Sequence, residues 1–67
     1  MFREYLTKII DRKNLTQSEM SEMIGLIFSG EVSDSQVGAF MAALATKGET
    51  FEELAGAAQA MRRKALR

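Results

Sequence analysis

Apolar residues recur at helical spacing along most of this chain. Between residues 34 and 47, Val37, Phe40, Met41 and Leu44 stand at positions i, i+3, i+4 and i+7, which is one face of an amphipathic helix. The same spacing predicts further helices over residues 2–12, 17–29 and 51–65. No segment alternates apolar and polar residues as a strand does. The pattern therefore predicts one all-α domain over residues 1–67, a four-helix bundle with short loops and no sheet.

Each predicted helix has a face that we expect to be buried. The faces of the other three helices are as follows in chain order: Phe2, Leu6, Ile9 and Ile10 with Tyr5 beside them on the first, Met20, Met23, Ile24, Ile27 and Phe28 on the second, and Leu54, Ala57, Ala58, Met61 and Ala65 on the fourth. All four internal methionines lie on such faces, so we expect them to fill the core. Ser21, Glu22 and Gly25 are expected mostly outside it.

Small residues form a second stripe on the third predicted helix. Gly38, Ala42 and Ala45 carry almost no side chain, so another helix could approach them closely. We expect the fourth helix to do so through Ala57 and Ala58. The last two helices are therefore predicted to pack unusually close together.

Polar residues mark the ends of the predicted helices. Three pairs match the capping box, in which two residues three apart exchange hydrogen bonds at a helix start: Thr16 with Glu19, Ser33 with Gln36, and Thr50 with Glu53. Gly30 and Gly48 follow the second and third helices, where glycine commonly ends a helix. The first helix is expected to end at Lys13-Asn14, because asparagine also tolerates the left-handed conformation used there.

The charges sum to zero but are unevenly distributed. Residues 14–61 contain seven acids and one base, Lys47. The last six residues contain four bases, which are Arg62, Arg63, Lys64 and Arg67. Such a cluster could bind phosphate or nucleic acid, or it could complement the negative end of a helix dipole. We favour the dipole, because no aromatic residue lies beside the cluster, and nucleic acid is not the expected partner.

The chain offers little catalytic chemistry. It has no histidine or cysteine, so the common nucleophiles, general bases and zinc ligands are missing. Glu52 and Glu53 could form an acid–base or metal pair, but acids at a helix start with Glu53 in a capping box are the simpler interpretation. We assign no catalytic, cofactor-binding or metal-binding residue. The sequence has neither a signal peptide nor an apolar run of membrane-spanning length, and a cytoplasmic protein is expected.

The apolar residues are more numerous than a short bundle can hide. Tyr5, Leu26 and Phe51 lie outside the main stripes, and a chain of this size buries only about 60% of its unfolded surface. Exposed apolar patches are typical of interfaces. We therefore expect the domain to bury part of its surface against another copy or another domain.

Several short motifs resemble the N-terminal helical domain of the anthranilate phosphoribosyltransferases. They are Gly30-Glu31-Val32-Ser33, Gln36, Ala39-Phe40, Ala42-Ala43-Leu44, Lys47-Gly48-Glu49-Thr50, Glu53 and Ala60-Met61-Arg62. The chain is also similar, less closely, to the matching domain of the pyrimidine nucleoside phosphorylases. A Ser-Gly pair would be expected after the methionine in that case, whereas Arg62-Arg63 follows Met61 here.

The resemblance implies a function for a longer protein. Such an enzyme transfers a phosphoribosyl group from phosphoribosyl pyrophosphate to anthranilate, with magnesium, in tryptophan biosynthesis. Its catalytic groups would belong to a larger α/β domain beginning after Arg67, so the 67 residues alone should be inactive. The alternatives are the phosphorylase domain, or a stand-alone helical module for interaction or nucleic-acid binding.

The resemblance also implies an interface. The helical domain of this family makes the homodimer contact and forms one wall of the cleft. By resemblance, the dimer contact is assigned to the first and third helices. The residues expected in it are Phe2, Tyr5, Leu6, Ile9, Phe40 and Leu44.

Overall fold

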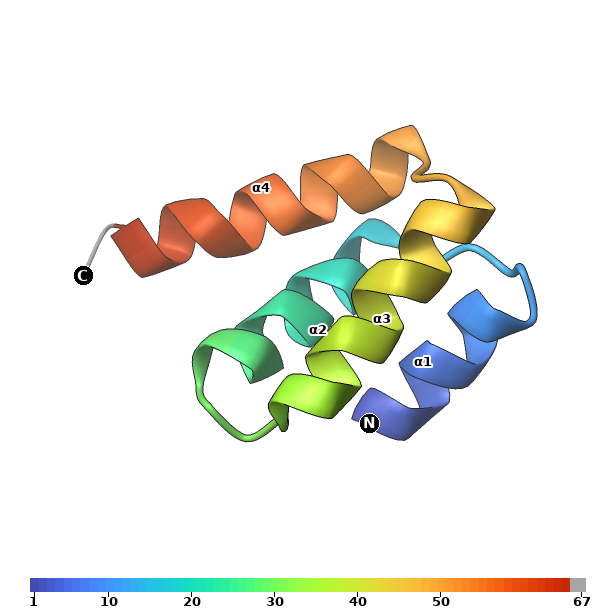
Figure 1. Cartoon of the computed structure of the whole chain (residues 1–67). Coiled ribbons are helices and arrows are strands. Elements are labelled where there is room, and N and C mark those ends of the chain that lie inside the picture. The colour runs from blue at the N-terminus through green and yellow to red at the C-terminus, as the bar shows by residue number, and fades with distance from the viewer. Residues whose placement is uncertain (66–67) are drawn as a thin grey trace.

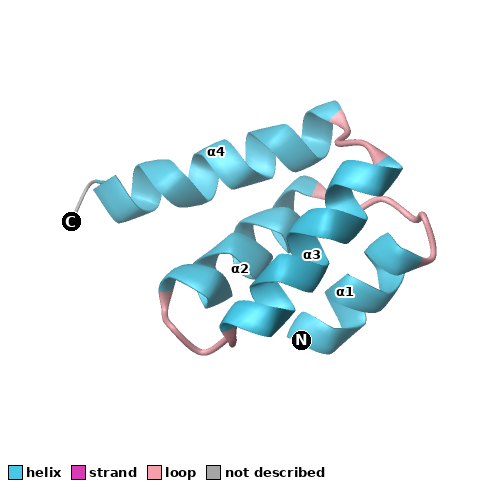
Figure 2. Cartoon of the chain, in the orientation of Figure 1, coloured by secondary structure: helices cyan, strands magenta, loops and turns pink. Residues whose placement is uncertain are grey.

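Four helices make up the fold in the computed structural model, which describes residues 1–65 (Figures 1 and 2). They are α1 (Phe2–Ile10), α2 (Gln17–Phe28), α3 (Asp34–Lys47) and α4 (Phe51–Ala65). No strand occurs in residues 1–65, and the predicted all-α class is confirmed. Helix α1 packs on α3 and α2, and α4 packs along α2. Figure 1 shows α4 crossing one side of the group formed by α1, α2 and α3.

The three predicted capping boxes are all formed. The Thr16 hydroxyl accepts the Glu19 N–H at 3.1 Å, and the Glu19 carboxylate accepts the Thr16 N–H at 2.9 Å. Ser33 with Gln36 and Thr50 with Glu53 make the same exchange. Because each box satisfies two backbone groups that a helix start leaves without partners, local sequence determines where α2, α3 and α4 begin.

The end of α1 differs from the prediction. The helix stops at Ile10 instead of residue 12, and the left-handed residue is Arg12, with φ 63°. The Arg12 N–H donates to the Ile9 carbonyl and the Lys13 N–H to the Lys8 carbonyl, which is a Schellman motif. The early turn brings Leu15 into the core, where it is 1% exposed. Helix α2 ends at Phe28, one residue before the predicted end.

The core lies where α1, α2 and α3 meet. Its buried members are Tyr5, Ile9, Leu15, Met20, Met23 and Phe40. Phe40 is fully buried, and its ring is tilted against that of Phe2 with centroids 6.5 Å apart. Met20 and Met23 fill the core as expected, but Met41 and Met61 are more than half exposed. The expectation for these last two methionines was wrong, because both lie on helix faces that no other helix covers.

The buried face of α4 is not the predicted apolar stripe. Glu53, Gly56 and Ala60 face inward, whereas Leu54 and Met61 are 57% and 54% exposed. A Cβ atom on Gly56 would collide with the carbonyl oxygen of Gln17 and would lie 2.9 Å from the Cβ of Met20. Helix α4 thus lies so close to α2 that only its small residues fit between the two backbones.

Two further expectations about this packing were wrong. Ser21 was expected outside the core but is 7% exposed, because its small side chain lies on the side of α2 near α4. The stripe Gly38, Ala42 and Ala45 is exposed, and a Cβ on Gly38 would meet nothing within 4 Å. The close helix pair is therefore α2 with α4, and α3 takes no part in it.

We predict opposite effects for two glycine-to-alanine substitutions. Gly56→Ala should lower the free energy of unfolding by about 1–3 kcal/mol, because the new methyl group forces α4 away from α2. Gly25→Ala, in the middle of α2 with no atom within 4 Å of its added Cβ, should raise it by about 0.5–1 kcal/mol through helix propensity. Urea denaturation followed by circular dichroism measures both, and equal effects would contradict the close packing.

Candidate functional site

The most buried polar group in the described residues is the Glu53 carboxylate. Its side chain is fully buried, and the Leu15 N–H, 38 positions away in sequence, donates to it at 2.7 Å. The Lys47 ammonium group donates at 2.8 Å and the Thr50 N–H at 2.9 Å. The Lys47 side chain is 5% exposed, and its ammonium group also donates to the Asn14 side chain at 3.0 Å. One carboxylate therefore joins the α1–α2 loop, the end of α3 and the start of α4.

This environment keeps Glu53 ionised. Burial by itself would raise the pKa of Glu53, but the hydrogen bonds from Lys47, Leu15 and Thr50 outweigh it and the pKa is lowered. The Lys47 ammonium group and the backbone N–H groups of Leu15 and Thr50 all donate to this carboxylate. Glu53 is thus a structural anion, as its capping role suggested. Neighbouring Glu52 is exposed and does not share the site. The sequence predicted the bond to Thr50 but gave no signal for those to Leu15 and Lys47.

A second polar set joins α1 to α2. The Tyr5 hydroxyl donates to the Glu22 carboxylate at 2.6 Å, and this bond, with burial, raises the pKa of Tyr5 to about 12. Lys8 forms an ion pair with Glu19 at 2.9 Å, which lowers the pKa of Glu19 together with its bond to the Thr16 N–H. A tyrosine with a raised pKa that donates to a carboxylate is a poor proton donor, so this set is also structural.

The six residues predicted to form an interface divide into two groups. Tyr5, Ile9 and Phe40 are at most 8% exposed and lie in the core of this chain. Their burial leaves them little surface for a partner. The spacing of a helix face does not distinguish internal packing from contact with another chain. Phe2, Leu6 and Leu44 are only partly buried against the core. These three remain candidates for an interface.

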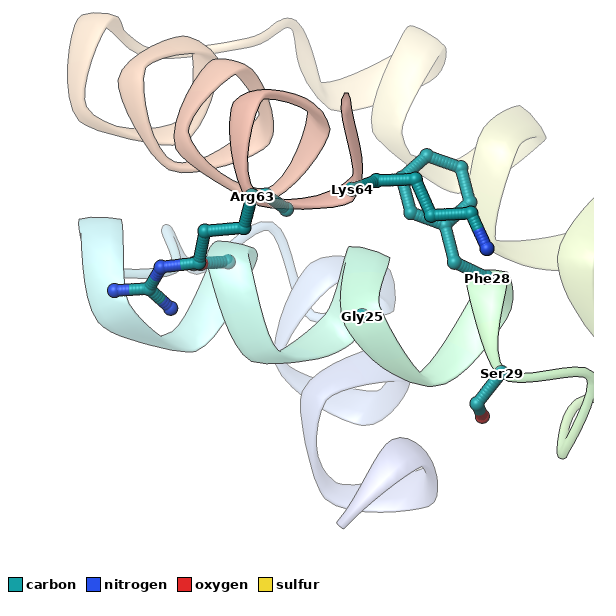
Figure 3. Close-up of a pocket in the computed structure, with 7 residues that line it drawn as sticks. Gly25, Phe28, Ser29, Arg63 and Lys64 are labelled. Carbon is teal, nitrogen blue, oxygen red and sulfur yellow. The ribbon is translucent and has the colours of Figure 1, made fainter. Parts of the chain in front are cut away.

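A shallow groove of about 300 Å³, open to solvent, lies between the C-terminal halves of α2 and α4. Its lining residues are Ser21, Gly25, Phe28, Ser29, Ala60, Arg63 and Lys64. Figure 3 shows Arg63 and Lys64 reaching over α2 on opposite sides of Gly25. The Lys64 ammonium group lies 5.7 Å from the centre of the Phe28 ring, within the range of a cation–π contact. Sequence reasoning missed this groove, because it treated α2 and α4 separately.

The bases of the C-terminal cluster occupy the last turn of α4. Arg62, Arg63 and Lys64 lie there, where cations complement the helix dipole, while Arg67 lies outside the described residues. Within residues 1–65, no group of three His, Cys, Asp or Glu side chains is arranged to hold a metal ion. None of the helices in the described part of the chain has the length and apolarity needed to cross a membrane.

Comparison with known proteins identifies the bundle. Residues 3–65 match the model of the glycosyl transferase family, helical bundle domain. The chain belongs to this family. It is 67% identical over all 67 residues to the anthranilate phosphoribosyltransferase of Desulfosudis oleivorans, 61% to that of Syntrophobacter fumaroxidans and 58% to that of Desulfatibacillum aliphaticivorans. The chain spans about a fifth of the length of these curated relatives.

The family match and the fold of the described residues agree. The match covers all four helices of the bundle. Within residues 1–65, the buried charged groups Glu53 and Lys47 are paired with each other and with backbone atoms. Within residues 1–65, the candidate functional surfaces are the α2–α4 groove and the partly exposed apolar residues.

We predict that the stability of the domain depends on the ionised form of Glu53. Since its pKa is lowered in the folded state, its contribution is fully present above the unfolded pKa of about 4.3 and is lost as the pH falls through the folded value. Glu53→Gln should lower the free energy of unfolding at pH 7 by about 3–5 kcal/mol, because Lys47 stays buried without its partner.

The exposed neighbour provides the control. Glu52→Gln should leave both the stability at pH 7 and its decrease on acidification close to those of the unmodified chain. Thermal unfolding followed by circular dichroism between neutral and acidic pH measures this. Indistinguishable curves for the two variants would contradict the role of Glu53.

Proposed function

We propose that this chain is the helical domain of an anthranilate phosphoribosyltransferase. The observation that carries the proposal is the identity of 58–67% to three such enzymes over the full 67 residues. The complete enzyme would transfer the phosphoribosyl group of phosphoribosyl pyrophosphate to the amine of anthranilate, in tryptophan biosynthesis. A cytoplasmic location belongs to the same proposal, since it follows from this biosynthetic role.

In this proposal, a larger α/β domain supplies the chemistry. Transfer of a phosphoribosyl group needs groups that bind diphosphate, and magnesium would assist there. The helical chain does not fit that task, because its described residues include no set of metal ligands and its buried carboxylate is already bound by Lys47 and two backbone N–H groups. The helical domain alone is therefore expected to be inactive and to act by positioning.

The alternative functions have weaker support. A pyrimidine nucleoside phosphorylase domain would be expected to carry Ser-Gly where this chain has Arg62-Arg63. A nucleic-acid-binding module would need a basic face, whereas three of the bases are confined to the last turn of α4 and the chain has no net charge. Neither alternative accounts for the identity to the three transferases.

We also propose that the domain forms a homodimer through α1 and α3. Large apolar side chains remain accessible on both helices: Phe2, Leu6 and Leu44 are partly buried, and Ile10 and Met41 are 59% and 55% exposed. Association would remove these side chains from water, which is favourable in proportion to the apolar area covered. Ile10 and Met41 thus replace Tyr5, Ile9 and Phe40 in the expected contact.

The enzymatic part of the proposal can be tested by domain exchange. We expect the Desulfosudis oleivorans enzyme to stay within about tenfold of its own activity when this chain replaces its matching 67 residues. The measurement is product formation dependent on anthranilate and phosphoribosyl pyrophosphate. The same exchange carrying Gly56→Leu should lose activity, because the leucine disrupts the α2–α4 contact. A folded but inactive exchange protein, or an active isolated chain, would contradict the proposal.

The dimer contact can be tested by substituting three residues whose side chains are similarly exposed. Sedimentation equilibrium of the 67-residue chain should show self-association that Ile10→Glu and Met41→Glu abolish. Leu54→Glu is the matched control, since Leu54 is 57% exposed but lies on α4. It should leave association unchanged. Loss of association only with Leu54→Glu would move the contact to α4, and a monomeric unmodified chain would rule out dimerisation by the domain alone.

A further inference from the structure

We propose that the groove between α2 and α4 binds a small organic anion. The ligand would place an apolar ring or short chain against Gly25 and Phe28, and a carboxylate or phosphate group beside Arg63 and Ser21. This binding site goes beyond the proposed transferase function. It is tested on the helical chain alone, so its failure and that of the domain exchange can be distinguished.

The first support is charge without a partner. Within residues 1–65, neither Arg63 nor Lys64 forms an ion pair, since the ion pairs there are Lys8–Glu19 and Lys47–Glu53. No acid follows Glu53 in α4, and none follows Glu22 in α2. The residues that line the groove therefore include two cations and no acid. Glu22 lines an adjoining hollow with Arg63, but its carboxylate accepts a hydrogen bond from Tyr5, and Arg63 can donate charge-assisted hydrogen bonds to a ligand.

The second support is a buried hydroxyl that faces the groove. Ser21 is more than nine-tenths buried and lines the groove. Its hydroxyl forms no hydrogen bond with the rest of residues 1–65. Since every fully buried side-chain oxygen and nitrogen atom there has a partner, the Ser21 hydroxyl oxygen cannot be fully buried. The hydroxyl is therefore accessible from the groove or from the adjoining hollow that Ser21 and Arg63 also line, and it can donate to a ligand oxygen.

The third support is shape. The floor at Gly25 is open, because a Cβ atom there would meet nothing within 4 Å. The Phe28 ring is 42% exposed and is held by the Lys64 side chain, and Figure 3 shows both at one end of the groove. A volume of about 300 Å³ is at the lower limit of small-molecule pockets. The groove combines an apolar floor at Gly25, the Phe28 ring and cationic side chains. This combination suits an anion with an apolar portion better than an inorganic anion.

Benzoate and phenyl phosphate are suitable probes, because they share a ring and differ in the anionic group. We expect saturable changes in the amide NMR signals of Ser21, Gly25 and Phe28 with at least one probe, at a millimolar dissociation constant. Tighter binding of phenyl phosphate would identify phosphate ligands, and tighter binding of benzoate would identify carboxylates. Inorganic phosphate tests the charge alone and should bind more weakly than phenyl phosphate.

Two matched glycine substitutions test the location. Gly25→Leu should abolish binding by filling the floor, while Gly38→Leu should retain it, since Gly38 is equally open but lies on α3. Both variants should fold, because leucine is the better helix former. Arg63→Gln should weaken binding by about tenfold through the loss of one charge-assisted hydrogen bond. Absence of saturable changes, unaltered binding to Gly25→Leu, or equal binding of inorganic phosphate would overturn the proposal.

Discussion

The Glu53 carboxylate is the interaction on which the arrangement of the helices depends. Isolated burial of a charge is strongly unfavourable, and this chain offsets it with the Lys47 ammonium group and two backbone N–H groups from Leu15 and Thr50. The donors come from three separate segments, so the carboxylate cannot be satisfied unless all three meet. A chain without cysteine, and so without disulfides, thereby fixes its loops through one hydrogen-bonded anion.

The same constraint determines which side of α4 faces outward. With Glu53 anchored near Leu15, the residues one and two turns later, Gly56 and Ala60, are directed onto α2. The larger residues on the opposite side, Leu54 and Met61, are then left exposed. Close contact at Gly56 also sets the distance between the two helices. Near their C-terminal ends, where Arg63 and Lys64 lie on α4, the two helices border a shallow groove.

Local sequence signals were sufficient for the helices and their starts, because a capping box involves residues only three positions apart. They were insufficient for the choice of face on α4. An apolar stripe usually marks the buried side, but here a closely packed helix pair required Gly56 and Ala60, and the partner of Glu53 lies 38 residues away. The groove and the burial of Tyr5 and Phe40 likewise depend on how helices pair, which periodicity does not encode.

The hydrogen bonds around Glu53 and the exposed apolar side chains have complementary effects in this domain. Ile10 and Met41 on two helices, and Phe51 and Leu54 on a third, remain largely in water, which a single short chain cannot avoid. Such surfaces are useful only if their mutual orientation is fixed, since an interface gains little when its elements must first be ordered. Because the Glu53 network holds α3 and α4 against the α1–α2 loop, contacts on one helix are kept in register with those on the others. A helical bundle domain can in this way present surfaces on separate helices in one fixed arrangement.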